Sequence, residues 1–271
     1  MLTSDALMDG VAACRVARGE CVFWWLGQHG FVLKLGETVV LVDPYLSPNA
    51  SRRSPSLLKP EEVKGVGLVL GSHDHSDHID RPSWPALVRT NPQAVFVVPA
   101  PVAPGLRHDL GLDGDRVVGL RDGESMTRSG VTVSALPAAH ELLERPATPG
   151  AYACLGFVIK GNGVTVYHAG DTCLYEGLQE RLRAIRPQIM LLPINGRDAK
   201  RLRSGCIGNM TYQEAADLAG AVEPALTVPT HFDMFAGNTE DPALFADYMA
   251  VKYPRLNTII PEYGKLTRVA G

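Results

Sequence analysis

The stretch Gly71-Ser72-His73-Asp74-His75-Ser76-Asp77-His78-Ile79-Asp80 follows directly on the apolar run Val66-Gly67-Leu68-Val69-Leu70. Short apolar runs bounded by glycine are typical of buried β-strands. Histidines and carboxylates at the mouth of such a strand suit a core badly, but imidazole nitrogens and carboxylate oxygens bind zinc, iron and manganese. A single histidine here would fit an exposed polar turn better. The spacing His-x-His-x-Asp-His favours a metal site instead.

Three more candidate ligands each follow an apolar run further along the chain. They are His140, Asp171 and His231. Taken singly, a histidine at the start of a loop or an aspartate in a glycine turn has a more ordinary role than metal binding. Their shared position at predicted strand ends favours one common ligand set.

These seven residues suffice for two metal ions. We expect one ion on His73, His75 and His140, a second on Asp77, His78 and His231, and Asp171 as the bridge between them. Two cations ~3.5–4 Å apart lower the pKa of a shared water and can hold a bridging hydroxide, a nucleophile for carbonyl or phosphoryl centres. We also expect Asp77 to act catalytically by relaying a proton. Zinc or manganese fits these ligands, with iron as a further candidate.

The composition is that of an ordinary globular protein. The chain has 271 residues, of which 45% are hydrophobic and 20% charged, and this argues against disorder. A net charge of -3 gives no electrostatic reason to expect nucleic acid as a partner. No apolar run is long enough to cross a bilayer, and the N-terminus lacks the basic start of a secretory signal. Five cysteines without a C-x-x-C pair predict reduced thiols in a cytoplasmic protein.

Hydrophobic periodicity predicts an α/β chain without a linker, and therefore one domain over residues 1–271. We expect strands near 22–26, 31–35, 38–42, 66–71, 94–98, 116–120, 131–136, 152–160, 164–168, 188–193, 225–229, 257–260 and 264–268. We expect helices at about 4–18, 82–89, 101–110, 174–185, 211–221 and 241–252. Thr211 and Glu214 match a capping box at the start of one of these helices. Residues 46–65 and the segment after 193 read as polar loops.

The ligand motif resembles that of the metallo-β-lactamase superfamily. Within it, four segments are most similar to the L-ascorbate-6-phosphate lactonase group: Trp24-Trp25-Leu26-Gly27, Asp43-Pro44-Tyr45, His168-Ala169-Gly170-Asp171 and Pro229-Thr230-His231. The likeness runs from about residue 22 to the C-terminus and implies a four-layer αβ/βα sandwich with metals at one edge. It implies that Asp43 orients a ligand histidine, although on local sequence a turn residue before Pro44 fits equally well. It also suggests a homo-oligomer.

One position departs from the lactonase pattern. The residue that matches His140 is a carboxylate in the lactonase, so this chain has a site richer in histidine. The substrate therefore need not be the same. A second resemblance, to the N-acylphosphatidylethanolamine phospholipase D branch, is carried by the segments 75–80, 170–172, 192–195 and 209–214 and implies a phosphodiesterase. Asp80 is the extra carboxylate shared with that branch, where it would support the metal site; it fits a cap of the next helix equally well.

Several polar residues are candidates for substrate binding. The segment after the strand at 188–193 carries Arg197, Lys200 and Arg201, and arginine binds phosphate and carboxylate bidentately. A solvated charged loop is the alternative. Two asparagines are similarly placed, Asn195 and Asn209, and Arg52 with Arg53 forms a weaker pair. These residues predict a small, anionic metabolite.

Other residues are assigned no part in the chemistry. His29, His108 and His168 fall in turn, helix or sheet contexts, Trp24 and Trp25 fit the core, and Cys173 fits a small buried position. The leading hypothesis is a metal-dependent hydrolase of a lactone or related ester, with no membrane partner. A phosphodiesterase and a non-enzymatic metal or ligand sensor are the alternatives. An antibiotic-degrading β-lactamase is disfavoured because no export signal is evident and the ligand set lacks cysteine.

Overall fold

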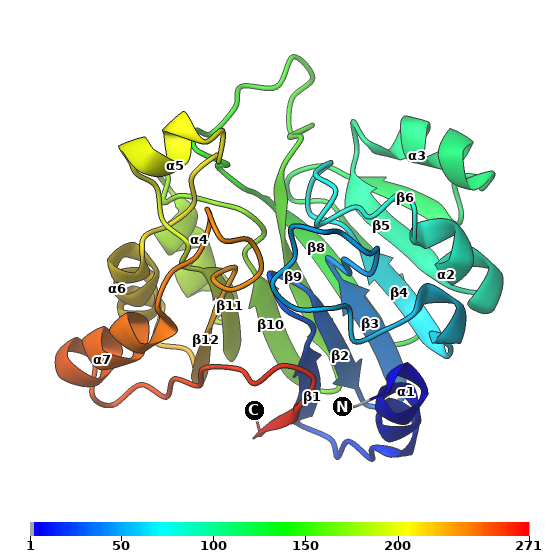
Figure 1. Ribbon diagram of the computed structural model, residues 1–271, viewed down its shortest axis with the longest axis horizontal. Helices are drawn as coiled ribbons and strands as arrows, with labels where there is room; N and C mark the ends of the chain where they lie inside the picture. The colour runs from blue at the N-terminus through cyan, green and yellow to red at the C-terminus, as the bar shows by residue number, and fades with distance from the viewer. Residues whose placement is uncertain (1–2, 271) are drawn as a thin grey trace.

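Two β-sheets face each other, and helices cover their outer sides (Figure 1). The structure is a computed structural model and describes residues 3–270. The seven-stranded sheet has the order β13-β1-β2-β3-β4-β5-β6. Its strands are β1 (Glu20–Trp25), β2 (Phe31–Leu35), β3 (Thr38–Val42), β4 (Val66–Leu70), β5 (Val95–Pro99), β6 (Val117–Leu120) and β13 (Leu266–Ala270).

The second sheet has six strands in the order β12-β11-β10-β9-β8-β7. They are β7 (Ser125–Arg128), β8 (Val131–Pro137), β9 (Leu155–Gly161), β10 (Val164–His168), β11 (Ile189–Pro193) and β12 (Leu226–Thr230). Strands β10, β11 and β12 run parallel to one another, as do β3, β4, β5 and β6. Parallel strands place their carboxyl ends at a common edge, where the connecting loops can build a site.

Helices form the two outer layers, and the predicted αβ/βα sandwich is confirmed. Against the seven-stranded sheet lie α1 (Ser4–Ala13), α2 (Trp84–Thr90) and α3 (Ala103–Leu110). The other sheet is covered by α4 (Leu178–Ile185), α6 (Tyr212–Val222) and α7 (Pro242–Lys252). Two short helices lie in loops, η1 (Pro60–Glu62) and α5 (Ala199–Arg203). None of the helices within residues 3–270 is long and apolar enough to cross a membrane.

Alternation along the strands of the first sheet fills two apolar layers at once. Phe23 of β1 packs between the sheets, whereas its neighbour Trp24 packs beneath the outer helices. Both faces of the sheet are therefore buried, which explains why its strands read as continuous apolar runs. The predicted places of Trp24 and Trp25 in the core are confirmed.

Some predicted elements differ from the structure. The N-terminal helix ends at Ala13, not near residue 18, where the backbone of Cys14 becomes extended. The buried Lys34 donates to carbonyl oxygens of the last turn, those of Val11 and Ala12, at 2.7 and 3.1 Å. Residues 257–260 form only a single bridge, between Thr258 and Thr227, so the predicted strand there is wrong. The polar segments that become β7 and α5 lack the apolar pattern that marks the other elements.

Candidate metal centre

Five segments bring the predicted ligands and Asp43 to one edge of the sandwich, each just beyond the carboxyl end of a strand. They are Asp43 after β3, the stretch from Ser72 to His78 after β4, His140 after β8, Asp171 after β10 and His231 after β12. The two sheets contribute to the same place because their parallel strands point the same way. Residues up to 188 positions apart in the sequence, the separation of Asp43 and His231, thus meet at one site.

The predicted ligand atoms form compact groups. His73, His75 and His140 make one group, and Asp77, His78 and His231 make another; within each, the ligand atoms lie within 4.8 Å of one another. A third group of the same compactness contains His73, His78 and Asp171, and so joins the two. The structure therefore brings all seven residues together at one site.

Asp171 contacts members of both main groups. Its Oδ2 lies 3.7 Å from His140 Nε2 and 3.1 Å from His231 Nε2, and its Oδ1 lies 3.4 Å from His78 Nε2. Two ligands that each lie ~2.1 Å from one tetrahedral ion are ~3.4 Å apart. The separations in the structure are therefore those of ligands that share an ion.

Buried polar atoms without protein partners point to the same conclusion. Nε2 of His73, Nε2 of His78 and Oδ1 of Asp171 are buried and make no hydrogen bond to the described residues. An unsatisfied buried polar atom is costly, and three of them facing one another are unusual in a folded protein. Divalent cations would satisfy all three, so the residues present fit a metal centre.

The charges of the site suit ligation in different ways. Burial lowers the pKa of His73 and of His140, so both rings are neutral. Burial alone would raise the pKa of Asp171, but His231 and His78 hold it well below its ordinary value, and the group is a carboxylate. Burial alone would lower the pKa of His78, yet the carboxylates of Asp171, Asp77 and Asp43 raise it to about 10. His78 must therefore release a proton when it binds a metal.

Asp43 fixes the orientation of His78. Its Oδ2 lies 2.6 Å from His78 Nδ1 and accepts from the Ser72 hydroxyl at 2.7 Å, while its Oδ1 accepts from the Ser72 amide at 2.8 Å. The residue has a φ of 44°, a left-handed conformation that turns the chain sharply after β3. With the proton of His78 held on Nδ1, Nε2 is the atom presented to the site.

Asp80 takes neither of its two expected roles. Its carboxylate accepts hydrogen bonds from the amides of Leu46 and Ser47 at 2.8 and 2.7 Å, and from the Ser47 hydroxyl at 2.6 Å. Helix α2 begins later, after Ser83. Asp80 thus fastens the loop after β3 to the His-rich stretch, and it does so two residues beyond the ligand His78.

The two candidate asparagines lie behind His140, away from the wall of the cavity. Asn209 Oδ1 is 3.1 Å from His140 Nδ1, and Asn209 Nδ2 donates to Asn195 Oδ1 at 3.1 Å. Both side chains are fully buried. Their position fits the orientation of a ligand histidine, not the direct substrate contact that we predicted.

The predicted basic contacts are engaged elsewhere. Arg197 binds Glu214 with two hydrogen bonds of 2.5 and 2.6 Å, and Arg201 binds Asp198 and the Thr239 carbonyl oxygen. Lys200 is exposed on α5. The Arg52 guanidinium donates to carbonyl oxygens of its own loop, those of Tyr45, Ser47 and Ser54. Together with Arg53, these residues lie outside the lining of the cavity at the metal centre.

That cavity has a volume of about 220 Å³. Its lining combines five predicted ligands with loop residues that the sequence did not single out: His75, Asp77, His140, Asp171 and His231, then Gly205, Cys206, Ile207 and Asn238. None of these loop residues stands directly after a strand or within a ligand motif, so no pattern in the sequence marks them. Within residues 3–270, no arginine or lysine lines this cavity.

Gln28 is a further residue that sequence reasoning missed. Its Nε2 donates to Asp77 Oδ2 at 2.9 Å and lies 3.2 Å from His231 Nε2. The side chain is buried, and the backbone adopts a φ of 53° in the turn between β1 and β2. The flanking Gly27 and Gly30 indicate the turn, but nothing in the sequence shows that it reaches the metal centre.

Two histidines without a predicted role support the floor of the site. The rings of His29 and His168 pack against each other with centroids 3.8 Å apart and an interplanar angle of 33°, and His29 Nε2 lies 3.1 Å from the Gly170 carbonyl oxygen. Both are fully buried, whereas His108 is exposed on α3. Cys173 is buried as predicted.

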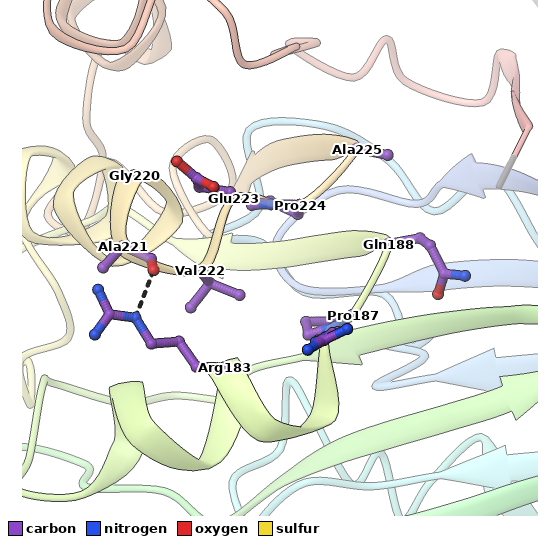
Figure 2. A pocket seen from close by; sticks show the side chains of 10 residues that line it. Arg183, Pro187, Gln188, Gly220, Ala221, Val222, Glu223, Pro224 and Ala225 are labelled. Carbon is purple, nitrogen blue, oxygen red and sulfur yellow. Dashed lines mark hydrogen bonds between the residues drawn. The ribbon is translucent and has the colours of Figure 1, made fainter.

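A larger hollow, of about 740 Å³, lies away from this edge, between the ends of α4 and α6 (Figure 2). Arg183 borders it and donates to the Ala221 carbonyl oxygen at 2.7 Å. It contains none of the grouped histidines and carboxylates, so volume alone does not identify the functional site.

Comparison with known proteins identifies the family. The Beta-lactamase superfamily domain matches residues 38–232, well over half of the chain. A UPF0173 metal-dependent hydrolase of Thermoplasma acidophilum is 32% identical over 223 residues, which cover 82% of this chain and 87% of the relative. A UPF0173 metal-dependent hydrolase of Caldivirga maquilingensis is 29% identical over 245 residues, which cover 89% of this chain and 94% of the relative.

A solved structure shows the same fold. Igni18, described as a metallo hydrolase from the archaeon Ignicoccus hospitalis, has a TM-score of 0.72 at 22% identity, with 92% of this chain and 98% of that chain covered. The family match, the relatives and the grouped ligands agree. The chain belongs to the metallo-β-lactamase superfamily and is a member of its metal-dependent hydrolases.

Proposed function

We propose that this chain is a dinuclear hydrolase that opens a small lactone or a related ester. The observation that carries the proposal is the pair of three-residue ligand groups joined by Asp171. Two divalent cations, zinc or manganese, would supply a water of lowered pKa and stabilise the negative charge that develops on the attacked oxygen. His73, His75 and His140 would hold one cation, and Asp77, His78 and His231 the other.

The protein groups around the ligands set up this chemistry. Asp43 and Asn209 each contact the Nδ1 of a ligand histidine, so the Nε2 atoms of His78 and His140 face the site. Nδ1 of His73, by contrast, lies 3.1 Å from the Ser72 hydroxyl, a neutral group.

Asp77 is the group that would move a proton. Its side chain is 18% exposed, whereas that of Asp171 is 4% exposed, so Asp77 is the carboxylate nearer to a bound substrate. Burial alone would raise the pKa of Asp77, but His78 and His231 lower it. The group is therefore ionised and able to accept a proton from water and pass it to the leaving oxygen. Gln28 holds this carboxylate in place through Oδ2.

The cavity favours a carbonyl over a phosphodiester. Its volume of about 220 Å³ lies below the ~300–1,000 Å³ of sites for larger ligands. Proteins commonly bind phosphate through arginine, and no arginine or lysine of the described residues lines this cavity. An anionic group on the substrate, which we expected from the sequence, would have to meet the metals or the open side. This lining supports an ester or lactone as the substrate class.

The test is a comparison of substrates with defined metal content. Purified protein is stripped with chelator, reloaded with zinc, manganese or iron, and assayed against sugar lactones and bis-aryl phosphate esters. We expect lactone turnover that disappears with metal and returns on reloading. The Asp171→Ala variant should lose metal and activity together, while Asp74→Ala, which removes an exposed carboxylate paired with Arg81, should retain both. Turnover of the phosphate esters alone would indicate a phosphodiesterase, and turnover of neither would favour a sensor.

A further inference from the structure

A row of three asparagines connects the metal centre to the wall of its cavity. His140 Nδ1 lies 3.1 Å from Asn209 Oδ1, Asn209 Nδ2 donates to Asn195 Oδ1 at 3.1 Å, and Asn195 Nδ2 donates to Asn238 Oδ1 at 2.8 Å. Asn195 and Asn209 are fully buried, whereas Asn238 lines the cavity. The row therefore begins at a candidate ligand and ends where a substrate would lie.

Once His140 holds a metal, the orientation of each side-chain amide in the row is fixed, with its oxygen towards His140 and its NH₂ towards the cavity. A histidine that binds through Nε2 carries its proton on Nδ1, and Nε2 is the atom that faces Asp171. That proton requires an acceptor, so Asn209 must turn its oxygen to His140 and its NH₂ to Asn195. The same reasoning passes along the row, because each amide has one acceptor and one donor end. Asn238 then has its oxygen on Asn195 and its NH₂ left for the cavity.

The loop that carries Asn238 is held in place. This loop runs from β12 to α7, and the backbone N–H of Asn238 donates to the Phe235 carbonyl oxygen at 2.8 Å. The next residue, Thr239, accepts a hydrogen bond from Arg201 of α5. The side chain of Asn238 is thus held at its Oδ1 by Asn195 and at its backbone by Phe235. A group that orients a ligand must be held in this way.

We infer that Asn238 donates a hydrogen bond to an acceptor oxygen of the substrate, and that Asn195 and Asn209 are positioning residues that set this donor. The inference rests on the proposed function, since a metal on His140 fixes the direction. It assigns a neutral donor to the cavity, whose lining also includes the loop residues Gly205, Cys206 and Ile207. The favoured ligand class is one that presents a carbonyl or carboxylate oxygen to Asn238, and a ligand that presents an N–H there would meet a second donor.

The test uses acetate as a probe that has only acceptor atoms. The full chain is loaded with Co²⁺, whose absorption reports on bound ligands, and titrated with acetate. Asn238→Leu removes the donor without adding charge, and Asn238→Asp removes it but keeps the acceptor for Asn195. We expect both to weaken acetate binding about tenfold or more, since hydrogen bonds to charged groups are worth that much. Asn195→Asp should weaken it too, although Asn238 is intact, because the new carboxylate attracts the Asn238 NH₂ away from the cavity.

Metal affinity is measured on the same proteins by competition with a chelator. We expect the two Asn238 variants to bind Co²⁺ as the wild type does, which also shows that they are folded. The matched control is Thr239→Val, which changes the neighbouring side chain outside the cavity and should leave acetate binding unchanged.

Three outcomes would overturn the inference. The first is an acetate affinity that stays at the wild-type value in Asn238→Leu, even if it falls in Asn238→Asp. That result would show that charge, and not a hydrogen-bond donor, acts at this wall. A wild-type protein that binds Co²⁺ but shows no response to acetate would count against it equally. Wild-type protein that binds no Co²⁺ would instead refute the proposed function, and the inference with it.

Discussion

Nδ1 of His78 lies 2.6 Å from Oδ2 of Asp43, and both side chains are fully buried. The two residues belong to different connections, the turn after β3 and the stretch after β4. Because β3 and β4 are parallel neighbours, their carboxyl ends bring the pair together. Through this contact Asp43, at the end of β3, sets the orientation of the ligand His78, which follows β4.

Replacing Asp43 tests that relationship. In Asp43→Asn the acceptor is neutral and its NH₂ competes for Nδ1 of His78, so the ring no longer presents Nε2 reliably. We expect metal affinity at the Asp77, His78 and His231 group to fall about 10- to 100-fold, the usual cost of losing such a partner. Competition with a chelator measures it. Asp74→Asn, a change at an exposed carboxylate, is the control. Two metals bound with wild-type affinity in Asp43→Asn would show that Asp43 is only a turn residue.

The raised pKa of His78 predicts opposite effects of pH on the metal-free fold and on metal binding. Its value of about 10 in the folded state exceeds the ~6.5 of an unfolded chain, so protonated His78 stabilises the metal-free protein. That stabilisation is complete below about pH 6.5 and is lost as the pH rises towards 10. Zinc must displace the same proton, so its affinity should rise about tenfold per pH unit between about pH 6 and 8.

Two measurements check the pH dependence. The melting temperature of metal-free protein should fall from about pH 7 to 9, and calorimetry in buffers of different ionisation enthalpy should show protons released on zinc binding. A zinc affinity that does not change with pH would contradict the charge assigned to His78.

The positions of the seven candidate ligands were predictable because each stands directly after a strand or within the spaced His-rich stretch. Strand ends and ligand spacing are local features, and parallel strands bring such ends to one edge. The fold was predictable for a similar reason, since the apolar runs of the strands are continuous and their glycine boundaries are clear.

Residues that depend on how loops cross the edge were not predictable. Gln28 reaches the ligand Asp77, and Cys206 and Asn238 reach the cavity, from three separate loops. No periodicity places a loop side chain. Arg197 misled for the opposite reason. Its segment does pass near the edge, but Glu214 follows on α6 at a distance in sequence that conceals their pairing.

The turn before Asp171 should tolerate no side chain. Gly170 has a φ of 61°, and an added Cβ would collide with the carbonyl oxygen of Leu155. We expect Gly170→Ala to destabilise the protein by about 2 kcal/mol more than Gly123→Ala, because overpacking adds to the backbone cost that both changes share. Gly123 has a φ of 77° and open space around it, which makes it a matched control. Chemical denaturation measures both, and equal losses would contradict the steric argument.

Arg197 provides the sharpest test of substrate binding, because the sequence predicts a substrate contact and the structure gives its guanidinium to Glu214. In Arg197→Ala we expect the free energy of unfolding to fall by about 1 kcal/mol or less, as for other partly exposed ion pairs. The KM for a lactone should change less than about twofold, because Arg197 lies outside the lining of the cavity and its loss removes no contact to the substrate. Arg203→Ala, on the exposed end of α5, controls for the loss of one positive charge. A tenfold rise in KM confined to Arg197→Ala would return this residue to the substrate site and would require the loop after β11 to rearrange when substrate binds.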